Sequence, residues 1–118
     1  MFKNKKLSQQ YLKKELINKM SEKKVYQILS LCQKGYNLVS GEFAVKQAVL
    51  NKEVFLVIVA NEASSNTQKL FNDKCRYRNI PCIKWGSSED IGRSLGKEHR
   101  VVVGITNEKL ANKIMQMI

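Results

Sequence analysis

The sequence contains few of the residues from which metal and catalytic sites are built. Its 118 residues include one histidine and three cysteines, and no two cysteines have Cys-x-x-Cys spacing. Structural zinc needs about four thiolate or imidazole ligands at short spacings, which this set cannot supply. A Ser-His-Asp or Cys-His site needs a histidine beside its nucleophile, whereas His99 lies in the charged segment GKEHRV. We therefore expect no metal, no cofactor, no small-molecule substrate and no enzyme activity.

Long apolar runs and glycine-rich phosphate loops are also missing. The longest apolar run, residues 54–60, is far short of the roughly 20 residues that a membrane-spanning helix needs. The basic N-terminus, MFKNKKLSQQ, has no apolar core of the kind found in secretory signals. Neither SGEFAVK nor LGKEHR has the spacing of a P-loop. These absences predict a cytoplasmic protein without a membrane anchor, in which Cys32, Cys75 and Cys82 stay reduced.

Acidic residues are scarce relative to basic ones, and the excess of basic residues is uneven. The chain has 21 lysines and arginines against 10 acidic residues, which gives a formal net charge of +11. Residues 1–24 hold eight lysines and only two acidic residues, Glu15 and Glu22. RNA and other polyanions bind such surfaces because each neutralised phosphate releases counterions. The charge therefore indicates a polyanionic partner, and the alternative is that it serves solubility alone.

Helices and strands are predicted to alternate from residue 22 onward. Ser21 has the character of an N-cap and Gly35 that of a C-terminal stop, so they predict a helix over residues 22–34. Ser87 opens a capping box with Asp90. The other predicted elements are strands at 37–40, 54–60, 80–85 and 100–106, and helices at 41–51, 64–79, 87–96 and 107–118.

This alternation predicts the fold class, which is α/β. The run at 54–60 is continuously apolar, as in a strand that is covered on both faces. The helix at 64–79 is expected to turn Leu70, Phe71 and Cys75 inward. We therefore expect a three-layer α/β/α sandwich with a small mixed sheet over residues 21–118.

Residues 1–20 form a basic N-terminal extension in this scheme, with a pattern that allows a helix. Leu12, Leu16, Ile17 and Met20 recur at helical spacing among lysines. Two alternatives stay open: the segment is an arm that orders only on a partner, or Met20 is the natural start. The oligomeric state does not follow from the sequence, and a monomer is expected.

The first candidate site is the start of the helix at 41–51. A helix N-terminus has backbone N–H groups without partners, which favour an anion such as phosphate. Gly41 lets another backbone approach closely because it has no side chain. Phe43 and Gln47 are four residues apart and share a face, where a ring can stack on a base and an amide can read its edge. The alternative is that Phe43 belongs to the core and Gly41 only makes a turn.

The second candidate site is the loop that follows the helix at 87–96. Arg93, Lys97 and Arg100 give it three cations within eight positions, with His99 between them. The alternative is an ordinary solvated turn. The full set of candidate RNA-binding residues is Lys34, Ser40, Gly41, Glu42, Phe43, Lys46, Gln47, Arg93, Lys97, His99 and Arg100.

The segments LVSGEFAVKQAV, VFLVIVANEAS, NIPCIKW and IGRSLGK resemble the ribosomal protein L7Ae family of kink-turn RNA-binding proteins, and more narrowly its bacterial YlxQ-type members. The resemblance covers about residues 22–118. It implies the same α/β/α sandwich, and RNA held at the start of the second helix and by the loop after Leu95-Gly96.

The resemblance also identifies a departure from the family pattern. Family members carry Gly-x-Asn-Glu-x-x-Lys at the start of this helix, and the last three named residues read sheared G·A pairs at the bend. Gly41 matches the glycine, whereas Phe43, Ala44 and Gln47 occupy the asparagine, glutamate and lysine positions. Phosphate contacts position a protein and base contacts specify sequence, so the chain keeps the cations and has weaker base readers.

Residues and resemblance together predict a non-enzymatic RNA-binding protein of the ribosome or its assembly, which docks structured RNA, with kink-turn RNA as one candidate. The alternative is a protein-interaction module of the same fold that has lost specific RNA recognition and docks or dimerises through the N-terminal helix. A third alternative is that residues 1–20 act as a non-specific arm for polyanions.

Overall fold

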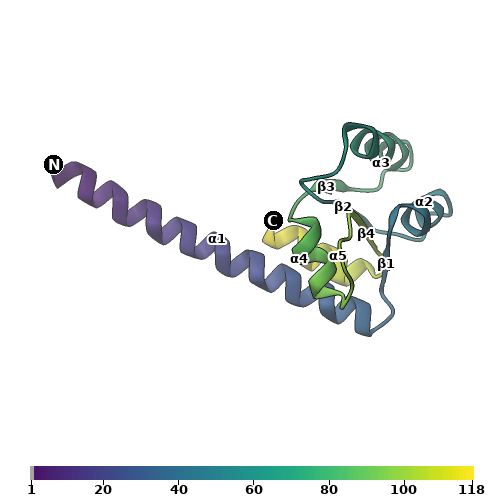
Figure 1. Ribbon diagram of the computed structural model, residues 1–118, viewed down its shortest axis with the longest axis horizontal. Coiled ribbons are helices and arrows are strands. Elements are labelled where there is room, and N and C mark those ends of the chain that lie inside the picture. The colour runs from purple at the N-terminus through teal and green to yellow at the C-terminus, as the bar shows by residue number, and fades with distance from the viewer. Residues whose placement is uncertain (1) are drawn as a thin grey trace.

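The computed structural model describes the backbone of residues 2–118 and the side chains of residues 9–118. Helices and strands alternate along the chain (Figure 1). Their order and bounds are α1 (Phe2–Lys34), β1 (Leu38–Ser40), α2 (Glu42–Leu50), β2 (Leu56–Val59), α3 (Ser65–Tyr77), β3 (Cys82–Lys84), α4 (Ser88–Ser94), β4 (Val102–Ile105) and α5 (Glu108–Met117). Every predicted strand is present, with shorter bounds than the sequence suggested.

The four strands form one small mixed sheet in the order β1-β4-β2-β3. Strand β4 pairs antiparallel with both β1 and β2, whereas β2 and β3 are parallel. In the register of β1 and β4, Ser40 lies opposite Val103. The end of β1 therefore lies beside the beginning of β4, which brings residues far apart in the sequence to the same edge of the molecule.

Helices cover both faces of the sheet, which confirms the predicted three-layer sandwich. Side chains alternate along β2: Leu56 and Ile58 pack with α1, α4 and α5 on one face, and Val57 and Val59 pack with α2 and α3 on the other. All four residues are buried. The continuous apolar run at 54–60 is thus explained by a strand that has a helix layer on each side.

Helix α1 differs from its predicted bounds, because it begins at Phe2 and continues without a break to Lys34. The prediction that Ser21 is an N-cap is wrong, since Ser21 lies inside the helix. Residues 2–34 contain no glycine or proline, and lysine, leucine, glutamine and glutamate are good helix formers, so nothing ends the helix between its two halves. The N-terminal half projects beyond the body as a rod (Figure 1), and the long axis of the molecule measures 57 Å.

The other helices largely follow the sequence predictions. Phe71 and Cys75 of α3 are buried as expected, but Leu70 is exposed because it lies about 100° round the helix from Phe71. The Ser87 hydroxyl accepts a hydrogen bond from the Asp90 amide at 3.0 Å, which confirms the N-cap of α4. The Gly35 amide closes the end of α1 by donating to the Leu31 carbonyl at 3.0 Å.

Candidate nucleic-acid interface

Helix α2 begins at a glycine whose backbone conformation other residues rarely adopt. Gly41 is the N-cap with φ 94° and ψ 151°, and no side chain caps the helix. Its amide donates to the Val102 carbonyl at 2.9 Å, so the turn is tied to the sheet. A Cβ atom built on Gly41 would meet nothing within 4 Å. The space beside Gly41 is therefore open, and no side chain caps the first-turn amides, which are groups that favour an anion.

Phe43 lies on the outer side of this helix. Its side chain is 78% exposed, so the alternative that it belongs to the core is wrong. The inner face of α2 is made by Val45, Ala48 and Val49, which are buried. Gln47, one helical turn after Phe43, is also exposed. An aromatic ring held this openly beside uncapped amides is a surface on which a base can stack.

The second candidate segment meets the first at this edge. The Arg100 Nε donates to the Ser40 hydroxyl at 3.3 Å. Arg100 shortly precedes the start of β4, and Ser40 ends β1, so the strand register brings them together. The guanidinium of Arg100 therefore lies beside the turn at Gly41 and adds a permanent positive charge to it.

Gly92 lets the loop that carries Lys97 and Arg100 pack closely against α4. A Cβ atom on Gly92 would overlap the carbonyl group of Glu98. The amide of Lys97 donates to the Gly92 carbonyl at 2.9 Å, and the amide of Arg100 donates to the Ser88 carbonyl at 3.0 Å. The loop after α4 thus lies directly against the helix. Sequence reasoning missed this role, although a glycine inside a short helix is a signal of close packing.

A further network under the same loop was also missed. The Glu62 carboxylate accepts from the Ser88 amide at 2.7 Å and from the Ser88 hydroxyl at 2.6 Å. The His99 Nδ1 lies 3.5 Å from that hydroxyl. These Ser88 hydrogen bonds lower the pKa of Glu62, and the nearby His99 adds to the effect. The contacts join the loop after β2, the start of α4 and the basic loop.

This network predicts a pH-dependent contribution to stability. The folded-state pKa of Glu62 lies below its ordinary value of 4.5, so the contribution is present above pH 4.5 and is lost as pH falls through the folded pKa. We expect Glu62→Gln to lower the free energy of unfolding at pH 7, and the difference to disappear once the pH is below the folded-state pKa of Glu62. Urea unfolding of both proteins at a series of pH values from 7 downward measures this. A difference that stays the same throughout the acid range would contradict the prediction.

The remaining candidate residues of α2 have distinct surroundings. The Glu42 carboxylate accepts from the Thr67 hydroxyl at 3.1 Å, which links the first turn of α2 to the start of α3. Glu42 is thus hydrogen-bonded to α3, and its negative charge stabilises the N-terminus of α2. Lys46 is half-buried on the same helix, one turn on from the first-turn amides.

Two of the predicted residues, Arg93 and Lys34, have other surroundings. Arg93 is ion-paired on its own helix, with Glu89 at 3.0 Å and Asp90 at 2.9 Å, so neighbouring carboxylates offset its charge. Lys34 ends α1 and is separated from Gly41 by a turn and the whole of β1.

Two hydrogen bonds connect residues 40 and 41 to residues 100 and 102 at this edge. The first runs from Arg100 to Ser40, and the second runs from Gly41 to Val102 at the start of β4. Lys97 and His99 are exposed in the basic loop that leads to Arg100. The structure therefore brings the turn at Gly41 and the end of the basic loop together.

The layered sheet, the uncapped start of α2 and the basic loop beside it define a small α/β/α protein with a glycine-led helix start and basic side chains at one edge. The chain belongs to the Ribosomal protein L7Ae/L30e/S12e/Gadd45 family, whose model matches residues 23–115. This confirms the family predicted from the sequence segments. The match begins inside α1, so the first 22 residues lie outside the family model.

Two curated relatives identify the branch of the family. RNA-binding protein YlxQ of Bacillus subtilis (strain 168) is 39% identical over 99 residues, which cover 84% of this chain and 99% of that protein. RNA-binding protein YlxQ of Enterococcus faecium is 31% identical over 102 residues, which cover 86% of this chain and 98% of that protein. The predicted resemblance to the YlxQ-type members is therefore confirmed.

Solved structures agree on the fold. A protein with unknown function from Bacillus halodurans C superposes with a TM-score of 0.77 at 34% identity, covering 80% of this chain and 95% of that one. The Giardia lamblia 15.5kD RNA binding protein superposes with a TM-score of 0.70 at 15% identity, covering 84% of this chain and 91% of that one. The second likeness shows the shared fold alone. Within residues 2–118, no helix is both long and apolar enough to cross a bilayer.

Proposed function

We propose that this chain is a non-enzymatic RNA-binding protein of the ribosome or its assembly. The RNA lies across the edge formed by Gly41, Phe43, Lys46 and the loop 97–100. The observation that carries the proposal is the uncapped, glycine-led start of α2, with an exposed Phe43 in its first turn and Arg100 hydrogen-bonded to the preceding Ser40. The names of the two YlxQ relatives, both of them RNA-binding proteins, support the same assignment.

Each part of the edge has a separate task in this proposal. The first-turn amides of α2 donate to a phosphate, and the open space at Gly41 lets the sugar-phosphate backbone come close. Arg100 and Lys97 neutralise neighbouring phosphates. Phe43 stacks on an unpaired base, which RNA loops, bulges and kink-turns all present.

The target is a folded RNA that is recognised more by shape than by base edges. The positions that read sheared G·A pairs in the family hold Phe43, Ala44 and Gln47 in this chain. Neither a phenyl ring nor a methyl group forms hydrogen bonds with a base edge, so only Gln47 retains that capacity. We therefore expect the protein to bind several bent or bulged RNAs with similar affinity, with discrimination that depends on an unstacked base.

Charge reversal tests the phosphate contacts. Lys46→Glu and Lys97→Glu should each weaken RNA binding several-fold and reduce the slope of log K against log salt by about 0.7–0.9 for each phosphate that is no longer neutralised. Fluorescence anisotropy with a labelled ribosomal RNA fragment at a series of salt concentrations measures both quantities. Lys113→Glu makes the same charge change on α5, in the helix layer on the other side of the sheet from α2, and serves as the control.

Unchanged salt slopes in both variants would place the RNA elsewhere on the molecule. An equal loss of affinity in Lys113→Glu would mean that net charge alone attracts the RNA, without a defined edge.

A further inference from the structure

The projecting part of α1 carries an apolar face that does not belong to the core. Leu12 and Leu16 are 61% and 59% exposed. The buried stripe of α1 includes Val25, and the positions 4, 7 and 11 residues before Val25 are Ser21, Asn18 and Lys14, which are all polar. Leu16 lies nine residues before Val25, which is about 180° round the helix at about 100° per residue, so the leucines of the rod lie on another face than the core stripe.

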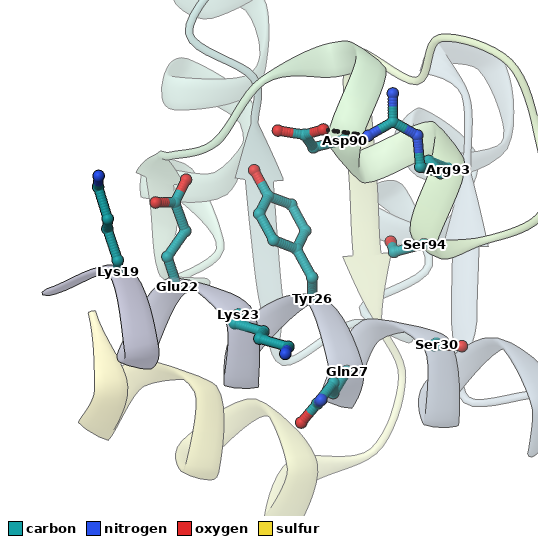
Figure 2. Close-up of a pocket in the computed structure, with 9 residues that line it drawn as sticks. All are labelled: Lys19, Glu22, Lys23, Tyr26, Gln27, Ser30, Asp90, Arg93 and Ser94. Carbon is teal, nitrogen blue, oxygen red and sulfur yellow. Dashed lines mark hydrogen bonds and ion pairs between the residues drawn. The ribbon is translucent and has the colours of Figure 1, made fainter. Parts of the chain in front are cut away.

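This outer face continues into a groove on the body. Leu12, Leu16, Lys19, Lys23, Tyr26 and Ser30 follow one another at spacings of four and three residues, so they share one side of α1. The last four of them line a groove of about 490 Å³ between α1 and α4, together with Glu22, Gln27, Asp90, Arg93 and Ser94 (Figure 2). The groove and the exposed leucines thus form one continuous track along the helix.

The inner end of the track is fixed by Tyr26. Its hydroxyl accepts a hydrogen bond from the Ser87 amide at 3.2 Å, and its ring centroid lies 4.7 Å from that of Trp85. The ring projects from α1 toward α4, and Lys19 and Glu22 project from α1 to one side of it (Figure 2). The Tyr26 ring is therefore fixed by contacts within the chain.

The charges along the track select the chemistry of its occupant. Lys19 and Lys23 line it from α1 beside Glu22. Arg93 lines it from α4, where its ion pairs with Glu89 and Asp90 offset its charge, so the two lysines carry most of the positive charge of the track. A second copy of the chain would bring another lysine-rich helix against this one, and residues 1–24 hold eight lysines. Like charges repel at such contacts. An RNA strand would be attracted by the lysines but would leave Leu12 and Leu16 exposed.

We propose that the track from Leu12 to Ser30 docks an acidic amphipathic helix of a protein partner. Apolar side chains of the partner cover Leu12 and Leu16, and its carboxylates face Lys19 and Lys23. The track runs from position 12 to position 30 of α1, about 27 Å at a rise of about 1.5 Å per residue, so the occupant is a helix of about five turns.

The track lies apart from the proposed RNA edge. The rod projects on the side of the body away from α2 (Figure 1), and most of it lies before residue 23, where the family match begins. Arg93 is the one residue of the groove that the sequence had also made a candidate for RNA binding. A chain that binds RNA at α2 can therefore hold a protein along α1 at the same time, and either activity can fail without the other.

The full-length protein can be tested with a synthetic peptide of about five helical turns that carries leucines at spacings of three and four, flanked by glutamates. We expect it to bind, and Leu12→Gln with Leu16→Gln to weaken binding at least about tenfold. Glutamine keeps helix propensity close to that of leucine. Ile17→Gln removes an exposed apolar side chain about 100° from Leu16 and should change binding less than about twofold. Fluorescence anisotropy of the labelled peptide measures these affinities.

A peptide of the same composition in scrambled order separates docking from charge attraction, and it should bind at least about tenfold more weakly. Equal binding of both peptides would overturn the proposal. It would also be overturned if sedimentation shows a dimer that the double glutamine variant dissociates, because the occupant would then be a second copy. Loss of RNA binding in that variant, with peptide binding unchanged, would assign the face to RNA instead.

Discussion

Replacing Gly92 with alanine should lower the free energy of unfolding by about 1–3 kcal/mol. In an ordinary helix the same change stabilises the protein by about 0.8–1.0 kcal/mol, because alanine has the higher helix propensity. The expected sign is reversed here because the new Cβ atom would overlap the carbonyl group of Glu98. Either the loop moves off α4 or the helix shifts, and both outcomes break the hydrogen bond from the Lys97 amide to the Gly92 carbonyl.

Gly92→Ala should also weaken RNA binding, because the displaced loop carries Lys97 and Arg100. We expect the affinity to fall several-fold to about tenfold, in line with one or two phosphate contacts. Urea unfolding and anisotropy titration of the same preparation measure the two effects. Ser94→Ala, in the last turn of the same helix, is the matched control. It should change the free energy of unfolding by less than about 1 kcal/mol. A stabilised Gly92→Ala variant with unchanged RNA binding would show that the loop does not need this close approach.

Replacing Phe43 with alanine should weaken RNA binding by about 1–3 kcal/mol, the range found for stacking of one base on an aromatic side chain. This corresponds to a fall in affinity of about 5-fold to 150-fold. The free energy of unfolding should change by less than about 0.5 kcal/mol, because the ring is 78% exposed and fills no part of the core. Phe43→Tyr keeps an aromatic face and should retain most of the affinity.

Tyr77→Ala is the control for this prediction. Tyr77 ends α3, is 84% exposed, and is an aromatic residue outside the proposed edge. Its removal should leave RNA affinity within about twofold of the original protein. Equal reductions in the Phe43 and Tyr77 variants would mean that exposed aromatic residues act non-specifically. An unchanged Phe43→Ala variant would leave the phosphate contacts as the only basis of binding.

Most of the fold could be predicted because its signals are local. The apolar run at 54–60 indicated a strand buried on both faces, and Leu56–Val59 packs against both helix layers. Ser87 was predicted as an N-cap from its spacing to Asp90, and the hydrogen bond between them is present. Glycines at 35 and 41 marked a helix end and a helix start, and both lie where predicted.

The errors came from signals that compete along the chain. Ser21 has the chemistry of an N-cap, but an N-cap also needs a preceding segment that is not helical, and residues 2–20 favour a helix. A continuous helix crosses the predicted boundary between the extension and the domain at residues 20 and 21, and that boundary stays a prediction. Leu70 was expected to face inward because it is apolar, yet Phe71 occupies the inner position and leaves its neighbour outside.

The candidate site was harder to predict because its geometry depends on long-range contacts. Nothing local in the sequence says that Arg100 touches Ser40, since 60 positions separate them and the strand register brings them together. The same holds for Glu62 and Ser88, whose hydrogen bonds join two loops. For Phe43 the sequence allowed both a core and a surface position, and only the packing of Val45 and Val49 decides between them.

The central claim is that the free amides at the start of α2 hold an RNA backbone. Titration of the ¹⁵N-labelled protein with a bulged ribosomal RNA fragment tests it directly, by following the amide resonances of residues 40–47. We predict that these resonances shift first and furthest, together with those of 97–100, and that Lys46→Glu reduces the shifts. Unmoved resonances at 40–47, with shifts confined to α1 or to α5, would contradict the account.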